Sequence, residues 1–247
     1  MIRHTWLEMG MPITVVIADP AATQSAIDPV IAYLSQINAR FSPYLETSEV
    51  GRLNAGAIKF DELSDDFALL LAMSGRTQDE TGGFFNIERD GRIDPSGIVK
   101  GWAINQASEL LRSQGWQNHI VEAGGDIQIA GVRPDGQPWR VGVRDPRDRN
   151  TNIKVLAVSD CGVATSGTAA RGEHIWNPVG DGLLDPTLLS LTVIAPSILD
   201  ADRMATAAFA MGKEGIAFIA NLPDFEGYAV FANGMATYTP GFDRYAV

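Results

Sequence analysis

Cysteine is almost absent from this chain of 247 residues, which contains only Cys161. A single cysteine excludes an intrachain disulfide and a cysteine-rich metal site. Its surroundings, "SDCGVATSG", are typical of a strand, so we expect a small buried residue and not a catalytic thiol. Histidine is also scarce, with 3 residues.

Positive charge is limited as well. The 19 Lys and Arg residues are outnumbered by 30 Asp and Glu residues, which gives a formal net charge of −11. A surface this negative repels phosphate backbones, so a nucleic-acid partner is not expected. A phosphate-bearing ligand would need local positive charge from a metal, a helix N-terminus or a well-placed lysine.

Long apolar runs and low-complexity linkers are missing too. No run reaches the roughly 18 apolar residues that a membrane span requires. The short apolar run near the N-terminus follows Glu8 and precedes Asp19-Pro20, which favours a strand over a signal peptide. We therefore expect a cytoplasmic protein. The remaining composition, 45% hydrophobic and 20% charged, is typical of a folded chain, and we expect residues 1–247 to form a single domain.

Helical and strand periodicities are both present. Helices are expected over much of 22–40, from Ser64, over about 100–114, over 200–212 and around 214–221. Strand patterns cover 12–18, 119–123, 127–131, 139–145, 154–160, 162–166 and 189–196, and a hairpin with a turn at Asn233-Gly234 closes the chain. This order predicts an α+β fold with mixed, largely antiparallel sheets flanked by helices, and two closely packed lobes with a cleft between them.

The stretch "DADRMATAAFAMG" places Asp202 and Thr206 four residues apart on one helical face. A carboxylate and a hydroxyl on such a face must find partners or stay in water. One interpretation is a solvated first turn with a capping aspartate, and we expect Asp202 at a polar helix end outside the core. The other is a pair of oxygen ligands for a divalent cation.

Three turns rich in glycine offer further candidates. "DPSGIVKGWA" places Asp94, Gly97 and Lys100 at or just before a helix start, where backbone N–H groups can hold an anion, although a structural turn fits equally well. "EAGGDIQIAG" favours a tight hairpin between two strands. "ATSGTAARGEHIWNP" contains His174, which is either a structural residue or a general base.

Together these segments resemble the ApbE-type FAD:protein FMN transferases, and the similarity runs in order through nearly the whole chain. The matching stretches are "MGM" at 9–11, "FSPYLETSEVGRLN" at 41–54, "GFFN" at 83–86, "IDPSGIVKGWAIN" at 93–105, "VEAGGDIQIAG" at 121–131, "ATSG…HIWNP" at 164–178 and "TVIAPSILDADRMATAAFAMG" at 192–212. Asn86 and Asn177 stand where the family usually has aspartate, and Met11 stands where it has threonine. The segment between "GFFN" and "IDPSG" is shorter than is usual in the family.

The resemblance implies a magnesium site and a flavin site. Its Mg²⁺ ligands correspond to Asp202, Thr206 and the backbone carbonyl of Gly97. Its flavin contacts correspond to Met9, Tyr44, Phe84, Phe85, Asn86, Asp94, Lys100 and Ile175. Because Tyr44, Phe84 and Phe85 lie in polar or glycine-rich surroundings, a buried core aromatic is less expected at these positions, and we expect at least one of them to contact the flavin ring.

The implied activity is Mg²⁺-dependent transfer of FMN from FAD to a threonine or serine hydroxyl of an acceptor protein, with release of AMP. His174 would take the proton of that hydroxyl. Two alternatives remain at this point: a Mg²⁺-dependent FAD hydrolase that gives FMN and AMP, and an FAD-binding protein without turnover.

Overall fold

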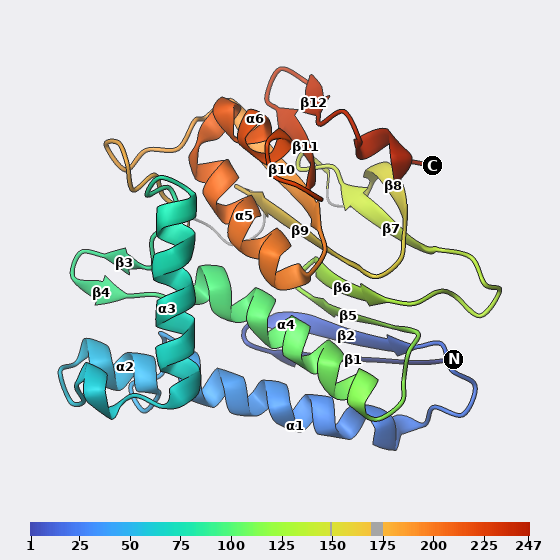
Figure 1. Ribbon diagram of the computed structural model, residues 1–247, viewed down its shortest axis with the longest axis horizontal. Helices are drawn as coiled ribbons and strands as arrows, with labels where there is room; N and C mark the ends of the chain where they lie inside the picture. The colour runs from blue at the N-terminus through green and yellow to red at the C-terminus, as the bar shows by residue number, and fades with distance from the viewer. Residues whose placement is uncertain (149, 169–174) are drawn as a thin grey trace.

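The computed structural model describes residues 1–148, 150–168 and 175–247. Its main element is an eight-stranded sheet in the order β1-β2-β5-β6-β9-β10-β11-β12 (Figure 1). The strands of this sheet are β1 (Ile2–Glu8), β2 (Met11–Ile17), β5 (His119–Ala123), β6 (Asp126–Ala130), β9 (Cys161–Gly167), β10 (Leu188–Ala195), β11 (Glu226–Phe231) and β12 (Ala236–Tyr238). Two small hairpins accompany it, β3 (Glu88–Arg89) with β4 (Arg92–Ile93) and β7 (Trp139–Arg144) with β8 (Asn152–Val158).

Every strand pairing among the described residues is antiparallel. Six α-helices and three short 3-10 helices complete the described structure. They are α1 (Gln24–Phe41), α2 (Glu49–Asn54), α3 (Asp65–Glu80), α4 (Ser96–Ser113), α5 (Ile198–Ala210), α6 (Gly215–Ala220), η1 (Phe60–Glu62), η2 (Gly212–Glu214) and η3 (Phe242–Arg244). The α+β class and the largely antiparallel sheet flanked by helices are therefore confirmed.

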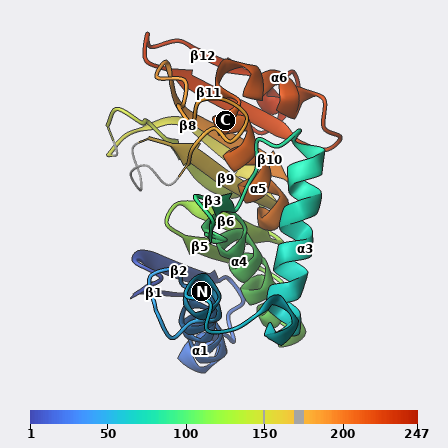
Figure 2. The same cartoon turned by 90° about the vertical axis from the view of Figure 1, so that its left-hand side faces the viewer.

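The sheet is covered on both faces, which explains why its central strands are so apolar. On one face, Ile13, Val15 and Ile17 of β2 join the core formed with the helices. On the other face, the alternate residue Val16 joins a smaller core with β7 and β8. Figure 2 shows α3, α4 and α5 on one side of the sheet and the β7–β8 hairpin on the opposite side. Cys161 is buried in β9, as expected, and burial raises the pKa of its thiol to about 12.

Capping residues and glycines in the sequence predicted the ends of several helices correctly. Ser64 accepts a hydrogen bond from the backbone N–H of Phe67 and caps α3, while Gly115, with φ of 93°, follows the C-terminal end of α4.

Strand β1 and the short helix α2 were not expected from the sequence. No helix in the described part of the chain combines the length and apolar character required to cross a membrane.

His119 is a core residue of β5 and predicts a pH-dependent stability. Its side chain is fully buried, with Nδ1 2.9 Å from the carbonyl oxygen of Trp116 and Nε2 2.7 Å from Oγ of Ser108. The carbonyl can only accept, so Nδ1–H donates to it and Nε2 accepts from the hydroxyl. Burial lowers the pKa of this imidazole to about 4.

A depressed histidine pKa makes the folded state less stable in acid, because the unfolded chain takes up the proton first. This contribution is complete above the unfolded pKa of about 6.5 and is lost as the pH falls from about 6.5 toward about 4. Between pH 7 and 5.5 we expect His119 to account for about 1 kcal/mol of the lost unfolding free energy. Urea unfolding of the parent and of His119→Gln at both pH values measures it. An equal loss in the two proteins would contradict this prediction.

Candidate functional site

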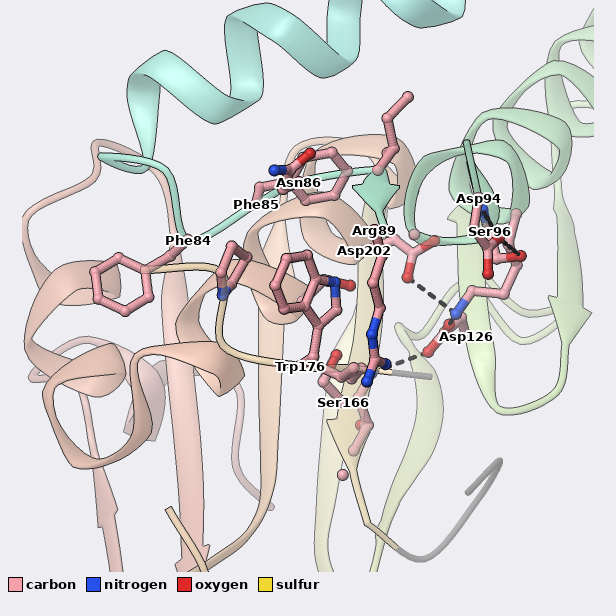
Figure 3. Close-up of a pocket in the computed structure, with 18 of the residues that line it drawn as sticks. Phe84, Phe85, Asn86, Arg89, Asp94, Ser96, Asp126, Ser166, Trp176 and Asp202 are labelled. Atoms are coloured by element: carbon pink, nitrogen blue, oxygen red, sulfur yellow. Dashed lines mark hydrogen bonds and ion pairs between the residues drawn. The ribbon is translucent and has the colours of Figure 1, made fainter. Parts of the chain in front are cut away.

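The central cavity lies where the start of α4, the chain after α3, the ends of β6 and β9, and α5 meet (Figure 3). Its volume is about 390 Å³. Ten of the residues that the sequence predicted for the site line it: Tyr44, Phe84, Phe85, Asn86, Asp94, Gly97, Lys100, Ile175, Asp202 and Thr206. Ile175 is itself buried. Residues from five separate segments are thus brought to one place.

Helix α4 begins at Ser96, earlier than the start near Lys100 that the sequence suggested. The side chain of Asp94 explains the early start, because its Oδ1 accepts a hydrogen bond from the backbone N–H of Ser96 at 3.0 Å. This contact satisfies one of the N–H groups that a helix start leaves unpaired. Because Ser96 and Gly97 of its first turn line the central cavity, the positive end of the α4 dipole lies at the cavity wall.

Gly97 lies in the first turn of α4, against α5 and the aromatic ring of Phe85. A Cβ atom at this position would lie 3.3 Å from Cε2 of Phe85 and 3.6 Å from Cγ2 of Thr206. A side chain here would crowd the Phe85 ring, while the 3.6 Å distance to Thr206 shows that Gly97 and Thr206 are close neighbours. This proximity brings two of the three predicted metal ligands to one wall of the cavity.

The third predicted ligand, Asp202, belongs to a buried ion network. Its Oδ1 lies 2.9 Å from Nζ of Lys100, and its Oδ2 accepts a hydrogen bond from the backbone N–H of Gly101 at 2.9 Å. Lys100 also pairs with Oδ2 of Asp126, whose Oδ1 accepts from the backbone N–H of Thr165 at 2.9 Å. The network has two carboxylates for one ammonium, and this negative excess suits a cation.

The position of Asp202 corrects one expectation. Helix α5 begins at Ile198 with Ser197 as its N-cap, so Asp202 lies in the second turn and not at a polar helix end. The side chain is only 3% exposed. A buried carboxylate is tolerated here because Lys100 and the Gly101 N–H compensate for its lost hydration.

The three predicted flavin-contacting aromatics differ in burial. Phe85 is fully buried within the main core, so the expectation that its surroundings disfavour a core aromatic was wrong for this residue. Its backbone N–H donates to Oγ1 of Thr81, which holds the turn after α3 in place. Phe84 is half-buried, and Tyr44 is 86% exposed. These two rings remain accessible to a ligand.

Met9 lines a second, more apolar cavity of about 540 Å³ between the β1–β2 turn and α1. The backbone of Met9 has φ of 54°, an unusual left-handed conformation for a side-chain-bearing residue. Glu8 supports this turn, because its carboxylate accepts hydrogen bonds from Asn38 of α1 and from the Met9 backbone N–H. Tyr44, Ser96 and Lys100 line both cavities, so the two spaces adjoin.

The two asparagines that replace the family's aspartates both hold local turns. Oδ1 of Asn86 accepts from the backbone N–H of Glu88 at 2.8 Å, and Oδ1 of Asn177 accepts from that of Val179 at 3.0 Å. Aspartate can make the same turn, so these substitutions remove charge without removing the turn. His174 lies outside the described residues.

Ten lining residues were not among the predicted site residues, and they include Arg89, Asp126 and Trp176. Asp126 directly follows Gly124 and Gly125, whose positive φ values make the tight β5–β6 hairpin that was expected. The "GGD" sequence was thus a usable signal, because the hairpin also delivers a carboxylate to the cavity. The pairing of Arg89 with Trp176 carries no comparable sequence signal.

The donors in the cavity fit a cation that retains much of its water. Across residues 1–148, 150–168 and 175–247, no three His, Cys, Asp or Glu side chains form a metal site by themselves. The predicted ligands are the Asp202 carboxylate, the Thr206 hydroxyl and the Gly97 carbonyl, all hard oxygen atoms of residues that line the cavity. Mg²⁺ favours such a set, since it binds few protein oxygens and keeps water or phosphate oxygens as its other ligands.

Sequence comparisons identify relatives of known family. The chain matches the ApbE family over residues 9–89 and 87–229. It is 34% identical over 131 residues to an FAD:protein FMN transferase of Vibrio cholerae, an alignment that covers 49% of this chain and 39% of that relative. A Haemophilus influenzae protein of the same name is 24% identical over 283 aligned positions, covering 88% of this chain and 82% of the relative. The alignments with the Vibrio cholerae and Salmonella typhimurium relatives thus span less than half of those proteins.

Solved structures show the same fold. The ApbE protein of Thermotoga maritima superposes with a TM-score of 0.88 at 21% identity, covering 100% of this chain and 99% of the other. The flavin transferase ApbE of Vibrio cholerae gives a TM-score of 0.84 at 22% identity, with coverage of 99% and 98%. The sequence match extends through most of the chain, and the fold agrees along its whole length. The chain therefore belongs to the ApbE family.

Proposed function

We propose that this protein is a Mg²⁺-dependent FAD:protein FMN transferase. It moves the FMN half of FAD to a threonine or serine hydroxyl of an acceptor protein and releases AMP. The observation that supports this most directly is the convergence of Asp202, Thr206 and Gly97 on one cavity beside the positive end of α4. The relatives named as FAD:protein FMN transferases support the same reaction.

The adjoining cavities give a dinucleotide room on both sides of its diphosphate. Lys100 and Ser96 lie at their junction, so the diphosphate would lie near these residues and the α4 N-terminus. Asp202, Thr206 and the Gly97 carbonyl would hold Mg²⁺, which would offset negative charge on the phosphoryl oxygens. In these positions the protein would hold the reacting phosphorus in place, which is a large part of catalysis in phosphoryl transfer.

In the transfer itself, the acceptor oxygen forms a bond to the phosphorus of the FMN half. The bond from that phosphorus to the bridging oxygen breaks, and AMP leaves with the bonding electrons. His174 takes the proton of the acceptor hydroxyl, which is a weak nucleophile while neutral. Lys100 and the α4 N-terminus stabilise the negative charge that develops on the phosphoryl groups.

Incubation of the protein with FAD, Mg²⁺ and candidate acceptor proteins tests the proposal. Mass spectrometry should detect FMN covalently attached to an acceptor threonine or serine, together with one AMP per adduct. Free FMN and AMP without an adduct would instead establish FAD hydrolysis. Stable FAD binding without either product would establish a binding protein.

The accessible rings of Tyr44 and Phe84 give a second test, which concerns contact with the flavin. We expect Tyr44→Ala or Phe84→Ala to lower FAD affinity about 2- to 10-fold, because stacking contributes roughly 0.5–1.5 kcal/mol beyond area burial. Phe85 is left unchanged, since truncating this core ring would cost about 3–5 kcal/mol of stability. Flavin fluorescence titration measures the affinity, with Phe60→Ala as a control at an exposed ring outside both cavities. If both variants bind FAD like the parent, the two rings have no part in flavin binding.

A further inference from the structure

Arg89 is positioned at the central cavity by a very short hairpin. Strands β3 and β4 are joined by Asp90 and Gly91, both with positive φ, which is the pattern of a two-residue type I′ turn. Asn54 of α2 fixes this hairpin, because its side-chain amide both donates to the carbonyl and accepts from the N–H of Ile93, each at 2.8 Å. The backbone that carries Arg89 is therefore held from a neighbouring helix.

The guanidinium of Arg89 lies over the indole ring of Trp176, 5.4 Å from the ring centroid. Both residues line the central cavity, and Figure 3 shows the two side chains together among the other lining residues. Stacking on an aromatic face restrains a guanidinium and leaves its in-plane N–H groups free to bind an oxyanion. Arginine is well suited to this use, since its planar fork can donate two parallel hydrogen bonds to a phosphate.

The charges around the cavity show why an anion needs Arg89. Among the described lining residues, the carboxylates are Asp94, Asp126 and Asp202, and the cations are Lys100 and Arg89. Lys100 is held between two buried carboxylates. The ion pair of Arg89 with Asp90, 3.8 Å long between exposed side chains, is weak and easily exchanged. Arg89 is consequently the lining cation that can turn to an incoming anion.

We propose that Arg89, stacked on Trp176, binds the diphosphate of the dinucleotide and selects diphosphate-bearing ligands over phosphate-free flavins. This inference rests on the proposed function and adds a specificity-determining contact to it. Trp176 acts through Arg89, as a positioning residue that holds the guanidinium at the cavity wall.

Binding titrations with FAD, ADP and riboflavin test this assignment. Arg89→Gln should weaken FAD and ADP binding about 10- to 100-fold, the range of one or two charge-assisted hydrogen bonds, and change riboflavin affinity less than about 2-fold. Arg92→Gln is the matched control. It removes the same charge from the directly opposite position of the same hairpin, where Arg92 is exposed and outside the cavity, and should leave all three affinities unchanged.

A Trp176 series separates positioning from direct flavin contact. Trp176→Ala should weaken FAD and ADP binding, and its effect should largely vanish in the Arg89→Gln background because the two side chains act as one unit. Trp176→Phe, which keeps an aromatic face, should restore much of the affinity. Weakened riboflavin binding in Trp176→Ala would assign the indole to the flavin and overturn the pairing.

Two results would reject the assignment to Arg89. Equal losses of FAD and ADP affinity in Arg89→Gln and Arg92→Gln would show that the overall charge of the hairpin, and not a contact from Arg89, governs binding. Parent-like FAD and ADP affinities in Arg89→Gln, while the parent still forms the FMN adduct, would overturn this inference and leave the proposed function standing. A parent protein that binds neither FAD nor ADP would overturn both.

Discussion

Asp202→Asn should reduce Mg²⁺-dependent FAD turnover at least about 100-fold at limiting Mg²⁺, as expected when a charged metal-binding group is lost. The side chain keeps its size, but it can no longer offer a negative charge to a cation. Its network of two carboxylates and one ammonium becomes neutral, which removes the negative excess that suits a metal. In a Mg²⁺ titration with AMP release as the readout, the Mg²⁺ concentration for half-maximal turnover should rise strongly, the maximal rate should fall, or both.

The asparagine variant is preferable to alanine because Asp202 is buried. Asp202→Ala would leave Lys100 with one fewer partner inside the protein, and breaking a buried ion pair typically costs about 3–5 kcal/mol. A loss of turnover in that variant would then mix unfolding with metal loss. Urea unfolding of Asp202→Asn should confirm that it remains folded during the assay.

Asp200→Asn provides the matched control on the same helix. Asp200 contacts Ser197 and Arg203 and lies outside both cavities, so its loss should reduce stability slightly and leave turnover at the parent level. Full turnover of Asp202→Asn at limiting Mg²⁺ would show that the ligand assignment is wrong. Equal losses in both variants would show that helix stability, and not metal binding, governs the rate.

His174→Ala should slow FMN transfer about 10²- to 10⁴-fold, the usual cost of removing a general base. Imidazole can accept a proton near neutral pH, and the acceptor hydroxyl must lose one during transfer. The next two residues along the chain, Ile175 and Trp176, line the central cavity. FAD affinity should change little, because His174 is not among the proposed flavin or metal contacts.

The other histidines serve as comparisons. His119 is fully buried in the core, and neither His119 nor His4 lines either cavity. His4→Ala, which alters a half-buried residue of β1, should therefore transfer FMN at the parent rate.

The decisive pair of measurements for His174→Ala is FAD titration and single-turnover AMP release with acceptor present. Parallel loss of affinity and rate would make His174 a structural residue, and loss of neither would show that His174 is not the general base.

The sequence predicted the features that depend on residues close to one another along the chain. Apolar spacing located most helices and strands, since periodicity reflects which side chains an element buries. The four-residue spacing of Asp202 and Thr206 placed both on one face of α5, and the glycine pair before Asp126 indicated the β5–β6 turn. The ordered motifs indicated the family.

Only the tertiary structure decided which distant residues meet. Asp202 was expected in water because its compensating partners, Lys100 and the Gly101 N–H, lie about a hundred positions earlier in the chain. Phe85 is buried because Gly97 of the next helix leaves room for its ring. Arg89 reaches Trp176 from a hairpin that a two-residue turn and a contact from α2 hold in place. The sequence by itself therefore determined most of the elements, the family and the chemistry of the candidate groups. Their burial and pairing came from long-range packing, which local periodicity does not record.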